Sequence, residues 1–366
     1  MYFLALIGTI AGLSAGVAPY LAPLIGAEAT PTFNAIAGIG MVLLAAVFNL
    51  MGTRMLSRVT ELGVWAGLAG LLVCGGYLLL FARVQSFDVL WQSYGAGDGN
   101  RTSALFAASL IGIWIFFGHE ACGDLAEEVQ DAGRQVPRAM ILTMLAGGVS
   151  ALLIALGMIL AVPDMAAAVN GNVNPAEAAL TQAFGPLGAK AMFLCLLLIV
   201  LSATVSVIAS CSRLLFALGR DNLVFGSHLM AKIDEARGLP VPAVAVATLV
   251  PVGIVALGVF APNAAAPIIS FATAGIYTAF AMVVLGALLA RARGWKPEGS
   301  FRLGALGWPI TIAGLIFEVG AVVNIIWPRP ASVDASFYTT NLIPIALVAT
   351  FVIGLLQLGR VGRVKE

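Results

Sequence analysis

The sequence predicts an all-α, polytopic membrane protein with about ten transmembrane helices. Hydrophobic residues make up 60% of the 366-residue chain and charged residues only 10%, and the mean hydropathy is +1.01. A soluble domain carries about 25% charged residues, so this chain could not cover a water-exposed surface. Apolar stretches follow one another along the whole chain with no room for a soluble domain between them. We therefore expect residues 1–366 to form a single integral membrane domain.

Each predicted span has the roughly 20 apolar residues that a helix needs to cross the hydrocarbon core. The longest polar intervals lie at residues 82–103 and 163–189, and the second can hold a short surface helix around residues 175–184. The expected spans are residues 2–25, 34–52, 62–82, 104–123, 139–162, 190–218, 241–261, 267–290, 307–327 and 341–359.

Along the chain, loops rich in Lys and Arg alternate with loops that contain few of them. If Met1 begins in the cytoplasm, the inner loops and the tail hold 15 of the 19 Lys and Arg residues. Because cytoplasmic loops are enriched in Lys and Arg, both termini are expected on the cytoplasmic side of the cell membrane. No basic segment precedes the first span, which is also too long for a signal peptide, so insertion through the spans themselves is expected. The outer side keeps only Arg83, Arg101, Lys190 and Arg329.

Composition also argues against other classes of protein. A net charge of +1 offers no basic face for nucleic acid. The four cysteines lie in apolar runs and show neither a metal spacing nor a disulfide framework. His119 and Glu120 begin like a zinc-protease motif, but Gly123 stands where the second histidine is required. We expect no enzyme and no cofactor, apart from coupling to H⁺ or Na⁺.

One segment, Phe116–Met140, runs from an apolar span into a cluster of ionisable residues. Glu120 follows Gly118 within or at the edge of the span, and a glycine loosens a helix by about 1 kcal/mol relative to alanine. This pairing predicts a helix break of the kind that exposes backbone groups. The residues equally allow Glu120 to be interfacial and Gly118 to be a packing contact. The acids beyond the span are expected to be solvated or paired with Arg134 and Arg138: Asp124, Glu127 and Glu128.

The stretch "WIFFGHEACGDLAEEVQDAGRQVPRAM" resembles the sixth helix and following loop of amino acid–polyamine–organocation (APC) permeases. The family's pattern is F-x-G-x-E, followed by E-E, N-P and P-R-A. Asp131-Ala132 replaces the usual Asn-Pro. The positions that match are Gly118, Glu120, Glu127, Glu128, Pro137, Arg138 and Ala139.

Two further stretches extend this resemblance over the whole chain. Asn49–Val59 is similar to the loop between the family's fourth and fifth helices. Ser210–Phe225, with "GLPVPAV" after it, resembles the end of the eighth helix. The first span then corresponds to the family's third helix, so a truncated sequence or an internal methionine is expected, and a ten-helix variant of the family is the alternative. The glycines of the first span, Gly8, Gly12 and Gly16, are spaced for close helix packing rather than for the family's first-helix break.

The resemblance implies a partial five-plus-five inverted-repeat (LeuT-like) fold with substrate at the midplane. The unwound element would be Phe116–Glu120, whose backbone would bind the substrate's amino group, and Trp114 would be an aromatic gate. Helix packing explains the aromatic and hydroxyl members of this set as well. The implied substrate-binding residues are Trp114, Phe116, Phe117, Gly118, Glu120, Thr273 and Tyr277. Structural or gating roles fall to Glu127, Glu128, Pro137, Arg138, Arg213, Arg220 and Asp221, the last three as pairs at the inner surface.

A further set of residues bears on whether transport is coupled to H⁺ or to Na⁺. Glu120 is the candidate for a proton-linked or conformational switch, or for a hydrogen bond that holds the break. His119 would lie about 100° around a helix from it and is expected to be structural. The lysine of many proton-coupled members would fall near Gly67 and is absent. Hydroxyls of the sixth span could bind Na⁺, although such groups more often bond to backbone: Ser202, Thr204, Ser206 and Ser210.

The implied function is secondary transport of an amino acid or related amine by alternating access, within a lipid bilayer. Similarity to the amino acid–choline branch extends the substrate class to 4-aminobutyrate, polyamines or choline. The alternative is a non-transporting fragment of such a permease. We expect no substrate-dependent uptake by the 366-residue chain alone and uptake by an upstream-extended form. The oligomeric state stays open.

Overall fold

The computed structural model describes residues 1–28, 30–92, 94, 101–171, 174–234, 238–260, 265–296, 299, 301–327 and 341–364. Within these ranges the regular elements are helices, and the one strand-like pairing is a single bridge between Asp234 and Leu239. The all-α prediction is therefore confirmed.

The described residues form fourteen α-helices of varied length and three short 3₁₀-helices. They are α1 (Tyr2–Ala15), α2 (Ala18–Ile25), α3 (Pro31–Leu50), α4 (Thr53–Leu80), η1 (Phe87–Trp91), α5 (Arg101–Ile115), α6 (Ala121–Asp124), η2 (Ala126–Glu128), α7 (Ala132–Ala161), α8 (Met165–Val169), α9 (Pro175–Arg220), α10 (Ser227–Met230), α11 (Val241–Leu257), α12 (Ala265–Ala292), η4 (Gly304–Leu306), α13 (Gly307–Ile326) and α15 (Leu342–Val364).

The helices match the predicted spans in order and position. Seven stretches are long and apolar enough to cross a membrane by length and composition: Tyr2–Ile25, Pro31–Leu50, Thr53–Leu80, Ala132–Ala161, Pro175–Arg220, Pro267–Ala292 and Gly304–Ile326. Three shorter apolar helices, Arg101–Ile115, Val241–Leu257 and Leu342–Gln357, occupy the other three predicted spans. The polytopic fold predicted from composition is thus confirmed.

The first predicted span contains an interruption, and another interruption precedes the sixth span. The first is divided into α1 and α2 near Gly16, and Pro19 lies in the first turn of α2. The sixth is the second part of α9, because Gly185 adopts a left-handed φ of 69° and Pro186 follows it. Residues 175–184 therefore form the predicted short helix, and the chain changes direction before it enters the span.

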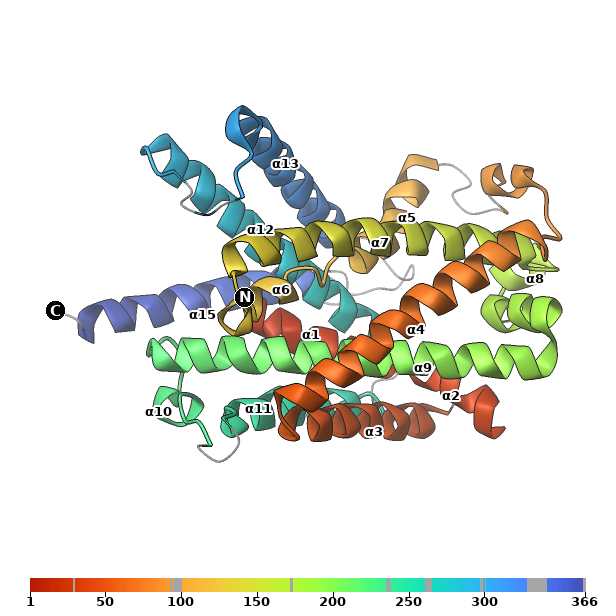
Figure 1. Cartoon of the computed structure of the whole chain (residues 1–366), viewed down its shortest axis with the longest axis horizontal. Coiled ribbons are helices and arrows are strands. Elements are labelled where there is room, and N and C mark those ends of the chain that lie inside the picture. The colour runs from red at the N-terminus through yellow and green to blue at the C-terminus, as the bar shows by residue number, and fades with distance from the viewer. Residues whose placement is uncertain are drawn as a thin grey trace.

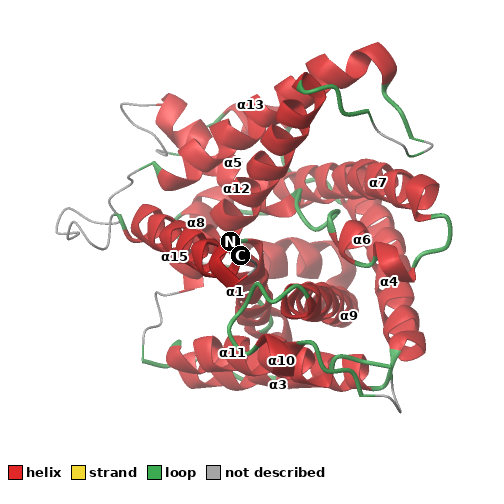
Figure 2. Ribbon diagram, turned by 90° about the vertical axis from the view of Figure 1, so that its left-hand side faces the viewer, coloured by secondary structure: helices red, strands yellow, loops and turns green. Residues whose placement is uncertain are grey.

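Helix α9 lies near the middle of the bundle, which is clearest in the end-on view of Figure 2. It contacts α1, α3, α4, α7 and α11. Val205, Ile208 and Ala209 of α9 are fully buried in a core cluster with apolar residues of α1, α3, α4 and α11. Helices α12 and α13 pack against each other above this core, and α12 also packs against α1 (Figure 1).

The close packing of α1 on α12 depends on small residues. A Cβ atom at Gly8 would lie 3.0 Å from the Cβ of Ala272, and one at Gly12 would lie 2.8 Å from Cγ1 of Ile269. The predicted packing role is confirmed for these two glycines. It is wrong for Gly16, which follows the last residue of α1 and would meet only carbonyls of its own helix.

Both marked termini lie toward the same end of the bundle as α10, whereas α8 lies at the opposite end (Figure 1). An even number of membrane crossings would place both ends on one side in this way.

Candidate functional site

The predicted helix break is present. Helix α5 ends at Ile115 and α6 begins at Ala121, so the intervening residues 116–120 are not helical. Gly118 has a φ of +111°, a backbone conformation that L-residues rarely adopt. No atom lies within 4 Å of the position that a Cβ would take there. Gly118 is therefore required by its backbone conformation, and the alternative that it is a packing contact is wrong.

The break releases backbone groups at the end of α5. Within the described residues, no backbone N–H donates to the carbonyls of Ile113, Trp114 or Ile115, because the helix does not continue past residue 115. A carbonyl that loses its helical partner needs another donor. The hydroxyl of Tyr277 on α12 supplies one, donating to the carbonyl of Ile113 at 3.0 Å.

Glu120 stabilises the turn that forms the break. Its Oε2 atom accepts a 2.7 Å hydrogen bond from the backbone N–H of Gly118, and its side chain is only 12% exposed. The predicted hydrogen bond that holds the break is thus confirmed. The role of Glu120 as a proton-linked or conformational switch stays a prediction.

His119 lies closer to Glu120 than helical geometry predicts. Its Nδ1 atom is 3.8 Å from Oε2 of Glu120, and its ring packs on Phe280 of α12 at a centroid distance of 5.7 Å. The expectation that the two side chains lie about 100° apart is wrong, because residues 117–120 are not in a helix.

Aromatic residues surround the break on the side of α12. Trp114 and Phe117 form an edge-to-face pair at 4.8 Å, and Trp114 approaches Gly12 of α1. Tyr277 packs edge-on against Phe280 and Phe317.

Phe116 is separate from this group. Its ring lies against Gly148 of α7, where an added Cβ would be 3.1 Å from the ring, and the side chain is 40% exposed. The structure therefore brings Trp114, Phe117, Gly118 and Glu120 together with Tyr277 and places Phe116 on another side of the break.

Thr273 lies one helical turn before Tyr277 and is buried like it. Its hydroxyl donates to the carbonyl of Ile269 in its own helix, at 2.8 Å. This bond accounts for Thr273 by helix packing, and its role toward a substrate stays a prediction.

The acidic residues after the break pair with the end of α9. Glu128 lies 3.1 Å from Arg213, and Glu127 lies 3.6 Å from Arg220, which is also 3.8 Å from Asp221. The expected inner-surface pair of Arg220 and Asp221 is thus present.

Three expectations for this region need correction. The predicted partners of the acids, Arg134 and Arg138, make no ion pair with a described residue and are exposed. The expected loop is shorter, since Pro137 and Arg138 already lie within α7. Asp124 is partly buried and accepts a 2.7 Å hydrogen bond from the hydroxyl of Tyr2, so it is neither solvated nor paired with arginine.

The hydroxyls considered for Na⁺ are mostly occupied by backbone carbonyls. Ser202 donates to Thr60 of α4, Thr204 donates to Val200, and Ser206 donates to Ser202. Ser210 is buried near the carboxyl of Asp124, and no partner among the described residues meets the geometry of a hydrogen bond to its hydroxyl. This pattern favours helix packing, as hydroxyls in membrane helices commonly show.

Helix α13 carries two polar residues that the sequence analysis passed over. Glu318 lies within an apolar run, close enough to Tyr277 to act on it electrostatically, and its Oε2 atom is buried without a hydrogen-bond partner. Asn324 donates to the carbonyl of Phe106 and to the hydroxyl of Ser109 on α5. The sequence did carry a signal for Glu318: an ionisable residue within a membrane span is a functional candidate by default.

Comparison with known proteins settles the family. The amino acid permease family matches residues 1–353. The chain belongs to this family. It is thus a permease of the APC superfamily, as the three sequence motifs indicated.

Its curated relatives are distant. The permease is 24% identical to amino-acid permease BAT1 of Arabidopsis thaliana over 86% of this chain and 63% of the relative. It is 27% identical to thiamine transporter thi9 of Schizosaccharomyces pombe over 65% of this chain and 41% of the relative. It is 25% identical to amino-acid permease 2 of Neurospora crassa over 70% of this chain and 48% of the relative. The chain spans less than two thirds of the length of each of these relatives.

Proposed function

We propose that this permease transports an amino acid or a related amine across the cell membrane by alternating access. Family membership supports the class of activity, and the names of the relatives support amino acids as the first substrates to test. The observation that carries the proposal is the break at residues 116–120, which leaves backbone carbonyls of α5 without helical partners.

These carbonyls suit an ammonium group. Trp114 and Ile115 present carbonyls that accept no backbone hydrogen bond from the described residues. A substrate ammonium is a compact donor that can replace the missing N–H groups. The Trp114–Phe117 pair adds aromatic rings beside the break, and a cation over an aromatic face is stabilised by about 0.5–2 kcal/mol.

Alternating access requires groups that can change partners at one end of the bundle. The pairs Glu128–Arg213 and Glu127–Arg220 join the segment after the break to the end of α9. We assign them to closing this end, and the excess of Lys and Arg in its loops supports a cytoplasmic location for it and for both termini.

Proton coupling through Glu120 fits better than Na⁺ coupling. The carboxylate lies at the break and accepts from the N–H of Gly118, so a change in its protonation would change the charge beside the released carbonyls. Three of the four hydroxyls considered for Na⁺ donate to backbone carbonyls instead.

The test is uptake into proteoliposomes by the protein as its gene encodes it, including any segment encoded in frame before Met1. A panel of radiolabelled amino acids, 4-aminobutyrate, polyamines and choline should contain a substrate with saturable uptake that an imposed proton gradient accelerates. Folded, inserted protein that moves none of them would overturn the transport proposal and favour a non-transporting membrane protein. Uptake driven by Na⁺ but not by H⁺ would overturn proton coupling and leave the transport proposal in place.

A further inference from the structure

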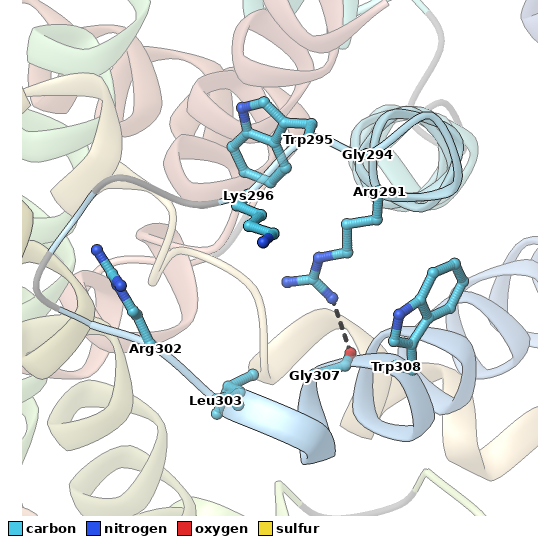
Figure 3. A pocket seen from close by; sticks show the side chains of 9 residues that line it. Arg291, Gly294, Trp295, Lys296, Arg302, Leu303, Gly307 and Trp308 are labelled. Atoms are coloured by element: carbon cyan, nitrogen blue, oxygen red, sulfur yellow. Dashed lines mark hydrogen bonds between the residues drawn. The ribbon is translucent and has the colours of Figure 1, made fainter.

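A basic pocket lies where α12 ends and α13 begins. Its volume is about 380 Å³, which is within the roughly 300–1,000 Å³ typical of small-molecule sites. Figure 3 shows cationic and indole side chains around it. The residues that define this pocket, called here the basic–tryptophan pocket, are Arg291, Trp295, Lys296, Arg302, Gly307 and Trp308.

Arg291 is held in place by α13. Its Nη1 atom donates to the carbonyl of Gly307 and to the hydroxyl of Thr311, both at 2.8 Å. Lys296 extends into the same space in Figure 3. Two cations are thereby directed toward one pocket, and one of them is immobilised.

Negative charge to balance these cations is missing from the described residues. No described carboxylate lies within 4.0 Å of Arg291, Lys296 or Arg302. Glu298 follows in the connecting segment and lies outside the described residues. Because these cations face one pocket with no described carboxylate beside them, an anion bound there would be stabilised.

The pocket lies at the expected depth of the membrane surface. Arg291 is in the last turn of α12, and both flanking helices are long and apolar enough to cross a membrane. Trp295 and Trp308 are about half exposed, at 52% and 47%. Tryptophan is enriched at the membrane–water interface, where lipid phosphates are found.

We infer that the basic–tryptophan pocket binds the phosphate of an anionic phospholipid headgroup. A lipid fits better than a free phosphate because apolar surface continues from the pocket into the membrane. Trp308 of the pocket and, one and two turns further along the same face of α13, Ile312 and Ile316 are exposed, so an acyl chain has apolar side chains to lie against. Basic pockets between spans on the cytoplasmic side are suited to such headgroups, and this end of α12 is the one that the charge distribution assigns to the cytoplasm.

The test compares two double variants of the full-length protein in detergent. Lys296→Gln with Arg302→Gln removes two exposed cations of the pocket and keeps Arg291, which supports α13. Arg54→Gln with Arg58→Gln is the matched control, because it removes two exposed cations near the α3–α4 connection. Native mass spectrometry would measure binding of phosphatidylglycerol and phosphatidylcholine, with inorganic phosphate as a competitor, after size-exclusion chromatography has shown that each variant is folded.

The wild-type protein should retain phosphatidylglycerol in preference to phosphatidylcholine. The pocket variant should bind phosphatidylglycerol roughly 25-fold more weakly, or about fivefold for each cation removed. The control variant should change little. Equal losses in both variants would overturn the site in favour of general surface charge. Displacement of the lipid by millimolar inorganic phosphate would overturn the lipid assignment in favour of a free-phosphate site.

Discussion

The hydroxyl of Tyr277 on α12 donates a 3.0 Å hydrogen bond to the carbonyl of Ile113, one turn before α5 ends. The two residues are 164 positions apart, so this bond joins distant segments at the point where the helix breaks. It gives the broken end of α5 a fixed position against α12.

Replacing Tyr277 with Phe removes the donor and keeps the ring. The carbonyl of Ile113 then lacks a partner, and the protein should lose about 0.5–2 kcal/mol of stability. The midpoint of thermal unfolding in detergent measures the loss. Tyr77→Phe is the control, because the Tyr77 ring packs on Phe81 and Phe184 and no hydrogen bond of its hydroxyl is found. Equal midpoints for the two variants would contradict the role of the bond.

Gly118→Ala should destabilise the break. Its φ of +111° costs an L-residue about 1–3 kcal/mol, although there is space for the methyl group. Thermal unfolding and uptake should both decline. Gly112→Ala in α5 also meets no atom within 4 Å, and it should be neutral or stabilising because its backbone is helical. A stable Gly118→Ala protein with normal uptake would show that the break is not needed.

Glu120→Gln separates the charge of this side chain from its hydrogen bond. Glutamine keeps an oxygen that can accept from the N–H of Gly118, so the break and the amount of protein in the membrane should persist. Uptake should fall, or its dependence on pH should flatten, since the side chain can no longer gain or lose a proton. His119→Gln and Glu128→Gln should have milder effects. A normal rate and pH profile in Glu120→Gln would leave this residue as a support for the break alone.

The two ion pairs after the break should differ in strength. Arg213 is 12% exposed and its partner Glu128 is 44% exposed, whereas Arg220 and Glu127 are 52% and 80% exposed. Water screens the second pair more strongly. A double-mutant cycle of Arg213→Gln and Glu128→Gln should give a coupling of about 1 kcal/mol in stability, and the Arg220–Glu127 cycle should give nearly none. The reverse order would contradict the structure.

Reporters fused after Arg58, Arg138, Lys232 and Arg302 should all report a cytoplasmic location. The reason is that cytoplasmic loops carry the excess of Lys and Arg. Reporters fused after Arg83 or Arg101 should give the opposite result. An external location for any of the first four reporters would contradict the predicted number of membrane spans.

Much of the fold could be predicted because each membrane-spanning helix must be apolar along its length to lie in hydrocarbon. A stretch such as Pro31–Leu50 is apolar whichever helix it packs against, so its position follows from local composition. The break at Gly118 was also a local property, visible as a glycine beside a carboxylate at the edge of a span. The same local reasoning failed for His119, because it assumed a helix through the residues that form the break.

Partners across the bundle could not be predicted in this way. The acids at positions 127 and 128 pair with Arg220 and Arg213 on α9 rather than with Arg134 and Arg138, which are nearer in sequence. Sequence distance carries little information about which helix ends meet. Glu318 was missed for a different reason: its significance depends on its approach to Tyr277, and that approach exists only once α12 and α13 are packed together.

The sequence by itself determined that this protein lies in a membrane, where its spans fall and which family it resembles, and it offered a helix break at Gly118 as one of two alternatives. Each of these follows from the hydropathy of consecutive residues or from motifs within one segment. Only the tertiary structure decided that Glu120 holds the break through Gly118, that Tyr277 supports the end of α5 and that Arg291 and Lys296 share a pocket. These relationships join groups whose separation in space is set by helix packing, and packing depends on all of the contacting surfaces together.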